Sequence, residues 1–325
     1  MLNFKRMLAS FWLAFASVSL AADYDPMRVA DSAIRTIDLS FGDPSRPREL
    51  PIRVYLPESK SPAPVILFSH GLGGSRAGSA FLGRHWAARG YLAVFMQHPG
   101  SDEGIWKDLP QVQRMPALRQ AASPENFMAR IGDVSATLNQ LERWHKTDGH
   151  DLSGRVDTSR VGMAGHSFGA VTTQAVGGQR FPNGERPTEA RIKAAVIMSP
   201  SAPKAASDET PSFAQVTMPW LLMTGTKDTF FIGGASVESR RAVFPALPAG
   251  DKYEVVLDRA EHSAFVETAL RGDTEPRNPN HHRVMMALST AFWDAYLRND
   301  ANARQWLAGA DARRVLERGD LWQHK

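Results

Sequence analysis

Short, compact apolar segments alternate with longer helical segments along most of this chain. Residues 64–69 (PVILFS) and 91–97 (YLAVFMQ) are nearly unbroken apolar runs. Runs of this kind are typical of parallel strands that are buried on both faces of a sheet. Parallel neighbours need a long crossover, which is usually a helix. The alternation therefore predicts an α/β fold with a mostly parallel central sheet and helices on both faces.

The expected elements follow this pattern after an initial antiparallel pair. Residues 34–39 and 51–56 are predicted strands, joined by the Gly-, Pro- and Asp-rich turn 41–49. Ser123 is the predicted N-cap of a long helix that has Pro124 at its first position. Further strands are expected at 64–69, 91–97, 159–164, 193–198, 220–224 and 253–257, and helices at 76–89, 124–145, 168–176, 280–298 and 303–318.

No linker divides these elements into two domains. The 325 residues, 43% apolar and 22% charged, are ordinary for a globular protein with one large core. We expect a single domain over residues 22–325, with small inserts at about 101–123, 177–188 and 229–247. The first insert carries Pro110 and Pro116 and is expected to be a loop or a loosely helical segment.

The first residues have the pattern of a secretory signal peptide. Lys5 and Arg6 precede the uncharged stretch 7–20, and small residues stand at the positions that a signal peptidase recognises. We expect cleavage after Ala21 and export to the periplasm or the medium. The alternative is a membrane anchor, but this stretch is short for a hydrocarbon layer of about 30 Å. No later stretch reaches the length of a membrane span.

Composition also restricts the possible partners and cofactors. The chain has no Cys, so it can form no disulfide. The net charge of +4 falls to about +2 without residues 1–21, and no Lys/Arg run occurs, so a nucleic-acid partner is not expected. The adjacent pair His281-His282 is not a helical two-His face, and Gly71–Gly74 lacks the spacing of a dinucleotide loop. We therefore expect no metal and no cofactor.

The segment Gly165-His166-Ser167-Phe168-Gly169 is the clearest indication of function. It stands where a predicted strand turns sharply into a helix, and its glycines suit a turn in which a Cβ would clash. Such a turn presents the Ser hydroxyl above the sheet edge, at a helix N-terminus that favours negative charge. Ser167 is therefore the predicted nucleophile. The alternative is an ordinary glycine-rich turn.

A Ser hydroxyl needs a base and an orienting acid, which in this kind of fold follow later in the chain. Asp228 comes four residues after the strand predicted at 220–224, and His262 comes five after the one at 253–257. Both positions are the carboxyl ends of strands, where open α/β sheets gather their sites. We predict His262 as general base and Asp228 as its partner. Asp258 is the rival acid, although its place in the loop before His262 favours a role in the turn.

Acyl transfer also needs N–H donors for the developing oxyanion. The predicted donors are the backbone N–H of Phe168 and that of Leu72, in the loop His70-Gly71-Leu72-Gly73-Gly74. His70 is expected to orient this loop rather than to react. Trp106, Phe230 and Phe231 lie in the inserts and are predicted to line the substrate pocket. The alternative is that they only seal the domain.

The motifs Phe68-Ser69-His70-Gly71-Leu72-Gly73 and Gly165–Ala170 resemble those of the plasma-type platelet-activating-factor acetylhydrolases and of related bacterial dienelactone-hydrolase-like esterases. The resemblance runs from about Arg53 to His262. It implies the α/β-hydrolase fold, a Ser-Asp-His triad and a Leu/Phe oxyanion hole. Dienelactone hydrolases proper use a Cys nucleophile, so Cys-based lactone chemistry is not expected.

We therefore expect a serine esterase that acts on small-molecule or lipid-like esters with short to medium acyl chains. The alternatives are a phospholipase- or lipase-like enzyme or a polyester hydrolase, and a non-enzymatic binding protein of the same fold.

Overall fold

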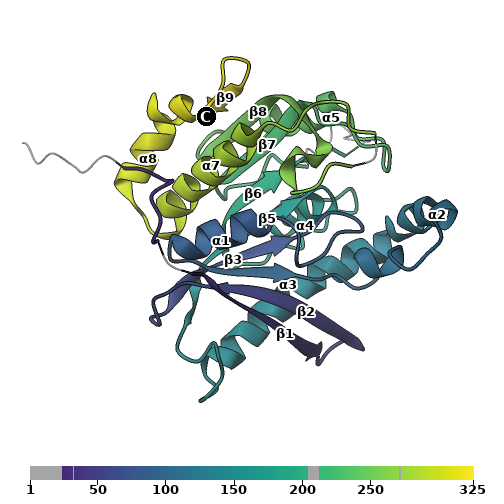
Figure 1. Cartoon of the computed structure of the whole chain (residues 1–325), viewed down its shortest axis with the longest axis vertical. Coiled ribbons are helices and arrows are strands. Elements are labelled where there is room, and N and C mark those ends of the chain that lie inside the picture. Colours follow the sequence, from purple (N-terminus) through teal and green to yellow (C-terminus); the bar gives the residue numbers. More distant parts are fainter. Residues whose placement is uncertain (1–23, 32, 204–211, 271) are drawn as a thin grey trace, which may run out of the picture.

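The computed structural model describes residues 24–31, 33–203, 212–270 and 272–325, and Figure 1 shows their arrangement. The predicted signal peptide, residues 1–21, lies outside the described residues. Over the described ranges the chain forms a nine-stranded sheet with the order β1-β2-β4-β3-β5-β6-β7-β8-β9. The strands are β1 (Arg35–Asp43), β2 (Arg48–Leu56), β3 (Ala63–Ser69), β4 (Leu92–Met96), β5 (Val156–His166), β6 (Ile192–Met198), β7 (Trp220–Lys227), β8 (Lys252–Glu261) and β9 (Leu321–His324).

The sheet is parallel in its centre and antiparallel at both edges. Strands β4, β3, β5, β6, β7 and β8 are parallel neighbours. Strands β1 and β2 form an antiparallel pair at one edge, with β2 antiparallel to β4, and β9 is antiparallel to β8 at the other. The mostly parallel sheet predicted from the apolar runs is confirmed.

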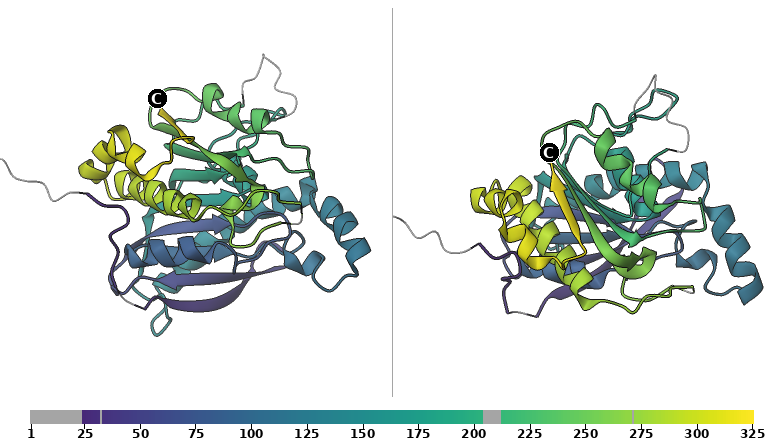
Figure 2. Two further views of the ribbon diagram at one scale, coloured as in Figure 1. Left: turned by 45° about the horizontal axis from the view of Figure 1, so that its top comes forward. Right: turned by 90° about the horizontal axis from the view of Figure 1, so that it is seen from above.

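Helices cover both faces of this sheet, as Figure 2 shows from two further sides. They are α1 (Ala80–Ala88), α2 (Gln111–Ala121), α3 (Pro124–His145), α4 (Phe168–Val176), α5 (Val237–Arg241), α6 (Val243–Ala246), α7 (Pro279–Leu297) and α8 (Ala301–Ala308). Alternate residues of β3 face opposite layers, because successive strand side chains point to opposite sides. Ile66 and Phe68 belong to the same buried cluster as residues of α1, α7 and α8, whereas Val65 and Leu67 belong to the cluster that includes residues of α3 and α4.

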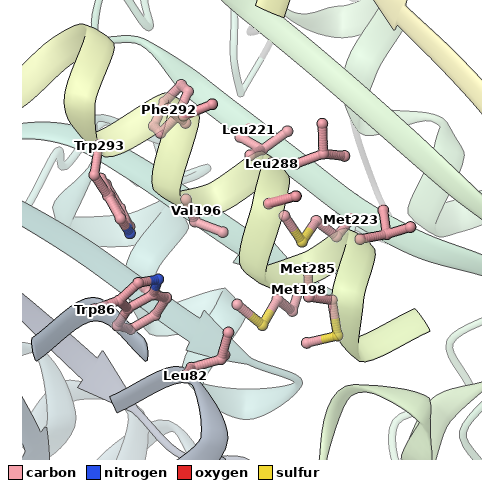
Figure 3. Packing of buried hydrophobic residues seen from close by; sticks show 14 of the residues in the cluster. Leu82, Trp86, Val196, Met198, Leu221, Met223, Met285, Leu288, Phe292 and Trp293 are labelled. Carbon is pink, nitrogen blue, oxygen red and sulfur yellow. The ribbon is translucent and has the colours of Figure 1, made fainter. Parts of the chain in front are cut away.

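The largest of the three buried hydrophobic clusters of the described residues lies under α1 and α7 (Figure 3). Trp86 of α1 meets Trp293 of α7 edge to face, with ring centres 6.0 Å apart. Gly162 of β5 lies directly beneath Trp293, and a Cβ at this position would come within 2.7 Å of that ring. Strand β5, which ends in the predicted nucleophile motif, thus packs closely against α7.

Several element boundaries differ from the sequence prediction. Strands β1 and β2 continue through most of the predicted turn 41–49, because cross-strand pairing extends to Asp43 and Arg48. Helix α1 begins only at Ala80, after Ser79 adopts a left-handed conformation with φ 55°. The insert at 101–123 is largely helical and contains α2, which projects from the body of the molecule in Figure 1.

The last predicted helix, residues 303–318, is wrong in its extent. Helix α8 ends at Ala308, a short 3₁₀ turn follows at Asp311–Val315, and the chain then adds strand β9. Trp322 of β9 is buried and stacks on Tyr253 of β8, with ring centres 5.7 Å apart. Pairing with β8 and burial of the Trp322 ring stabilise this strand of only four residues. No helix within the described ranges is long and apolar enough to cross a bilayer.

Candidate active site

Ser167 occupies a strained turn between β5 and α4. Its φ of 56° and ψ of −114° lie in a region that residues with a Cβ rarely adopt. The two motif glycines allow this turn for steric reasons. A Cβ on Gly165 would lie 2.2 Å from the carbonyl oxygen of Gly169, and a Cβ on Gly169 would lie 1.9 Å from that of Ser69. The close approach of backbone to backbone therefore requires glycine at both positions.

The structure brings the three predicted catalytic side chains into one hydrogen-bonded row. His262 Nε2 lies 2.9 Å from Ser167 Oγ, and His262 Nδ1 lies 2.7 Å from Asp228 Oδ1. Each residue directly follows the last residue of a parallel strand: Ser167 follows β5, Asp228 follows β7 and His262 follows β8. Because these strands are parallel, their carboxyl ends meet at the same sheet edge, as the prediction required.

Asp228 is fully buried and is held by more than the imidazole. Thr224 Oγ1 donates to Asp228 Oδ2 at 2.9 Å, and Arg240 Nε lies 3.0 Å from Asp228 Oδ1. Burial by itself raises the pKa of the Asp228 carboxyl. The hydrogen bond from His262 and the charges of His262 and Arg240 outweigh that effect and hold the pKa at about 2. Asp228 is therefore a carboxylate at neutral pH, as a partner of a His N–H must be.

Arg240 was not anticipated from the sequence. It lies on α5, inside the insert predicted at 229–247, and it donates to the backbone carbonyls of Asp228 at 2.7 Å and of Ser199 at 2.8 Å. The guanidinium thus joins the loops that follow β6 and β7. Phe230, from the same insert, stacks on the His262 ring with centres 4.5 Å apart. Arg240 thus contacts the Asp228 end of the row, and Phe230 contacts its His262 ring.

Asp258, the rival acid, lies apart from this row. Strand β8 extends through Glu261, so Asp258 belongs to the strand and not to the predicted loop before His262. Its backbone N–H donates to Asp320 at 2.7 Å, and its carboxylate accepts from Thr226 at 3.3 Å. The strand is longer than the apolar run because its pairing with β7 continues to Glu261.

The two predicted oxyanion donors lie beside Ser167. Phe168 is the first residue of α4, where a backbone N–H has no partner within the helix. Among the described residues, no protein acceptor takes the N–H of either Phe168 or Leu72. Leu72 lines both hollows that Ser167 lines, and Phe168 lines one of them. This arrangement leaves two N–H groups free to bind an anion next to the Ser hydroxyl.

His70 connects the oxyanion loop to the segment that follows β4, through one ring nitrogen on each side. Its Nδ1–H donates to the carbonyl of Gly71 at 2.7 Å, and its Nε2 accepts from the backbone N–H of His98 at 3.1 Å. Burial and the nearby charge of Arg130 keep the pKa of His70 well below its usual range, so the ring is neutral at neutral pH. These two hydrogen bonds fix the His70 ring between the oxyanion loop and the segment after β4.

Two hollows meet at Ser167. One has a volume of about 520 Å³ and is lined by Leu72, Ser167 and His262 together with the three predicted pocket residues, Trp106, Phe230 and Phe231. The other, of about 500 Å³, is lined by Phe168, Val171, Ile232 and again Leu72, Ser167 and Phe230. Trp106 is held in place by its indole N–H, which donates to the carbonyl of Gly73 at 2.7 Å. Apolar side chains dominate both hollows, as in sites that bind small molecules.

Within the described ranges, no group of three His, Cys, Asp or Glu side chains is arranged to hold a metal ion. The sheet, the strained serine turn at its carboxyl edge and the buried carboxylate behind a histidine together define a class of protein, the α/β-hydrolases.

Comparison with protein-family models supports this class and narrows it. The chain belongs to the PETase family, described as PET hydrolase-like, whose model matches residues 118–316. This family is part of the α/β-hydrolase superfamily of esterases, so the protein is a carboxylic-ester hydrolase and the predicted fold class is confirmed. No curated protein matches the chain.

Proposed function

We propose that the protein is a serine esterase in which Ser167 is the nucleophile, His262 the general base and Asp228 the residue that orients His262. The observation that carries this proposal is the unbroken row of hydrogen bonds from the buried Asp228 carboxylate to the hydroxyl of a strained serine. Asp228 accepts the Nδ1–H of His262, which leaves the lone pair of Nε2 directed at Ser167 Oγ.

The reaction follows as a two-step acyl transfer. His262 Nε2 takes the proton of Ser167 as Oγ attacks the ester carbonyl carbon, and the N–H groups of Leu72 and Phe168 bind the oxyanion. The protonated His262 then gives its proton to the leaving alkoxide as the ester C–O bond breaks. Water enters, loses a proton to His262, attacks the acyl-enzyme and releases the carboxylic acid, which restores the Ser167 hydroxyl.

The position of His262 assigns the two hollows to the two parts of an ester. The leaving oxygen must lie within hydrogen-bond reach of His262 Nε2 to be protonated. Only the hollow of about 520 Å³ is lined by the His262 ring, so we assign it to the leaving alcohol, with Trp106, Met115 and Leu118 on its walls. The hollow of about 500 Å³ then receives the acyl group.

Short to medium acyl chains, as in an acetylhydrolase-like esterase, suit this assignment. Val171 and Ile232 line the acyl hollow, and each buried methylene contributes about 0.8 kcal/mol until the chain outgrows the space. The rate should therefore rise from acetate over a few carbons and then fall.

A polyester hydrolase is the second candidate, and the mouth of the cleft favours it. Hollows open on both sides of Ser167, so a chain with repeated esters could extend in both directions. Phe231 and Leu270 at the rim are 60% and 42% exposed, and Val112 of the neighbouring helix α2 is 82% exposed. Exposed apolar groups around a cleft suit a solid apolar substrate. The family description, PET hydrolase-like, points to the same substrate class.

Covalent labelling with a fluorophosphonate probe tests the nucleophile. We expect one adduct by intact mass on the wild-type protein and none on Ser167→Ala, because only a hydroxyl with a bound base reacts quickly. Equal labelling of both proteins would contradict the proposal. Release of soluble acid from a polyester film, compared with rates on p-nitrophenyl esters, then separates the two candidate substrates.

We also propose that the protein is exported and loses residues 1–21. Expression of the full chain in a bacterium, followed by N-terminal sequencing of the soluble product, should give a protein that begins at Ala22. An intact Met1 on all of the folded, active protein would contradict export by cleavage.

A further inference from the structure

Arg130 of α3 is a fully buried cation below the site, and the reaction proposed above does not use it. Its guanidinium donates to the carbonyl of His70 at 2.6 Å, to Ser101 Oγ at 2.8 Å and, more weakly, to the carbonyl of Gly71 at 3.5 Å. Its Cζ lies 4.4 Å from the centre of the Phe168 ring. One side chain therefore contacts both of the segments that carry the predicted oxyanion donors.

This cation has no carboxylate partner of its own in the described part of the chain. The nearby Asp133 is engaged by His98, Arg46 and Arg48 at 2.8–2.9 Å and forms no ion pair with Arg130. Burying a charge without an opposite charge is costly. Burial lowers the pKa of Arg130 to about 9, which still leaves it protonated at neutral pH. Packing alone would be served better by an apolar side chain.

We infer that Arg130 is a positioning residue that aligns the Leu72 and Phe168 N–H groups and adds a fixed positive charge beneath the oxyanion. This inference rests on the proposed function. The charge acts in a buried setting, where a fixed cation stabilises a developing anion more strongly than it would in water.

The alignment of Leu72 follows from peptide geometry. In a trans peptide the C=O of Gly71 and the N–H of Leu72 point in opposite directions. Donors that hold the Gly71 carbonyl therefore aim the Leu72 N–H. They are His70 Nδ1 at 2.7 Å, the Gly74 N–H at 3.0 Å and the long contact from Arg130. The strong bond from Arg130 to the His70 carbonyl holds the preceding peptide, so the whole loop is fixed from below.

The alignment of Phe168 follows from its ring. The guanidinium lies over the face of this ring, and a desolvated cation–π contact is among the stronger ones. Phe127 also stacks with the Phe168 ring, with ring centres 6.4 Å apart. Because Phe168 directly follows the strained Ser167, a fixed ring also restrains the direction of the Phe168 N–H.

The test compares Arg130→Met with Arg130→Lys on a matched pair of esters, one oxoester and one thionoester. Sulfur is larger than oxygen and a weaker acceptor, so a thionoester gains little from N–H groups aimed at an oxyanion. We expect Arg130→Met to lower kcat on the oxoester by about 10- to 100-fold with KM nearly unchanged, since loss of one oxyanion donor costs about 10²–10³. The oxoester-to-thionoester rate ratio should fall by a similar factor. Arg130→Lys keeps the positive charge but loses the planar set of guanidinium N–H donors. Its kcat and its rate ratio should therefore lie between those of the wild-type protein and Arg130→Met.

The control is Arg89→Met, which removes a different partly buried arginine, bound to Asp294 on the α7 side. It should lower the melting temperature and leave the rate ratio unchanged. A ratio that stays at the wild-type value in Arg130→Met, or in Arg130→Lys if the Met variant does not fold, overturns the inference. Activity retained in Ser167→Ala would instead overturn the proposed function itself.

Discussion

Replacing Asp228 with Asn tests the proposed row of hydrogen bonds most directly, because the change is nearly isosteric. The Asn side chain can offer an N–H where Asp228 Oδ1 accepts the Nδ1–H of His262 at 2.7 Å. His262 would then carry its proton on Nε2, facing Ser167, and could not act as the base. In the serine-protease template the same change costs about 10⁴ in kcat, which corresponds to about 5.5 kcal/mol on the barrier.

The same substitution should also reduce the free energy of unfolding, because the lowered pKa of Asp228 contributes to it. The fall in the pKa of Asp228 from 3.8 to about 2 corresponds to about 2 kcal/mol of folding free energy. This contribution is present above about pH 4, where Asp228 is ionised in both states, and is lost as the pH falls through about 2. Asn also leaves the buried Arg240 without its carboxylate, so we expect a total loss of about 2–4 kcal/mol.

The assay is kcat/KM on p-nitrophenyl butyrate together with urea unfolding at pH 7, and Asp258→Asn is the matched control. Asp258 lies on β8 outside the row, so its variant should keep turnover within about twofold and stability within about 1 kcal/mol. If Asp258→Asn is inactive and Asp228→Asn is nearly normal, the acid has been assigned to the wrong residue. If Asp228→Asn is as stable as the wild-type protein, the ionised Asp228 does not contribute the expected amount of about 2–4 kcal/mol to the free energy of unfolding.

Gly169→Ala should destabilise the fold by at least about 3 kcal/mol or prevent folding, because its Cβ would lie 1.9 Å from the Ser69 carbonyl oxygen. Thermal unfolding measures this loss, and the control is Gly42→Ala, whose Cβ would meet nothing within 4 Å. Trp106→Ala should change the preference among leaving alcohols at constant acyl group, measured as relative kcat/KM; a change confined to acyl preference would reverse the assignment of the two hollows. Butyrate esters should be hydrolysed faster than long-chain esters, and a rate jump at an oil–water interface would favour a lipase instead.

The fold class and the tight serine turn could be predicted because each depends on local chemistry. The apolar run 64–69 has no polar face to expose, and such runs are typical of parallel strands; in the structure every residue of β3 is buried. The turn at Ser167 admits only glycine at positions 165 and 169, so these two glycines indicate the turn in the sequence. The proximity of His262 and Asp228 to Ser167 could be predicted because the carboxyl ends of parallel strands meet at one edge of the sheet.

Other elements were missed because they depend on neighbours distant in the sequence. Strand β9 has only four residues and no strong apolar pattern, and it forms because β8 offers a free edge beside Tyr253. Helix α2 contains Pro116 and has few buried residues, so its helical period is weak in the sequence. Local pattern alone does not specify such segments.

The positions of Arg240 and Arg130 around the site depend on the tertiary structure alone. Arg240 contacts the loop of Asp228 from a helix that begins nine residues later, and Arg130 contacts His70 across sixty residues. No spacing rule relates these positions, because a long arginine side chain can reach a carbonyl from many directions. A strained turn requires particular residues next to each other in the chain, so it can be recognised as a short sequence motif. A hydrogen bond between distant residues requires no such motif and is visible only in the folded structure.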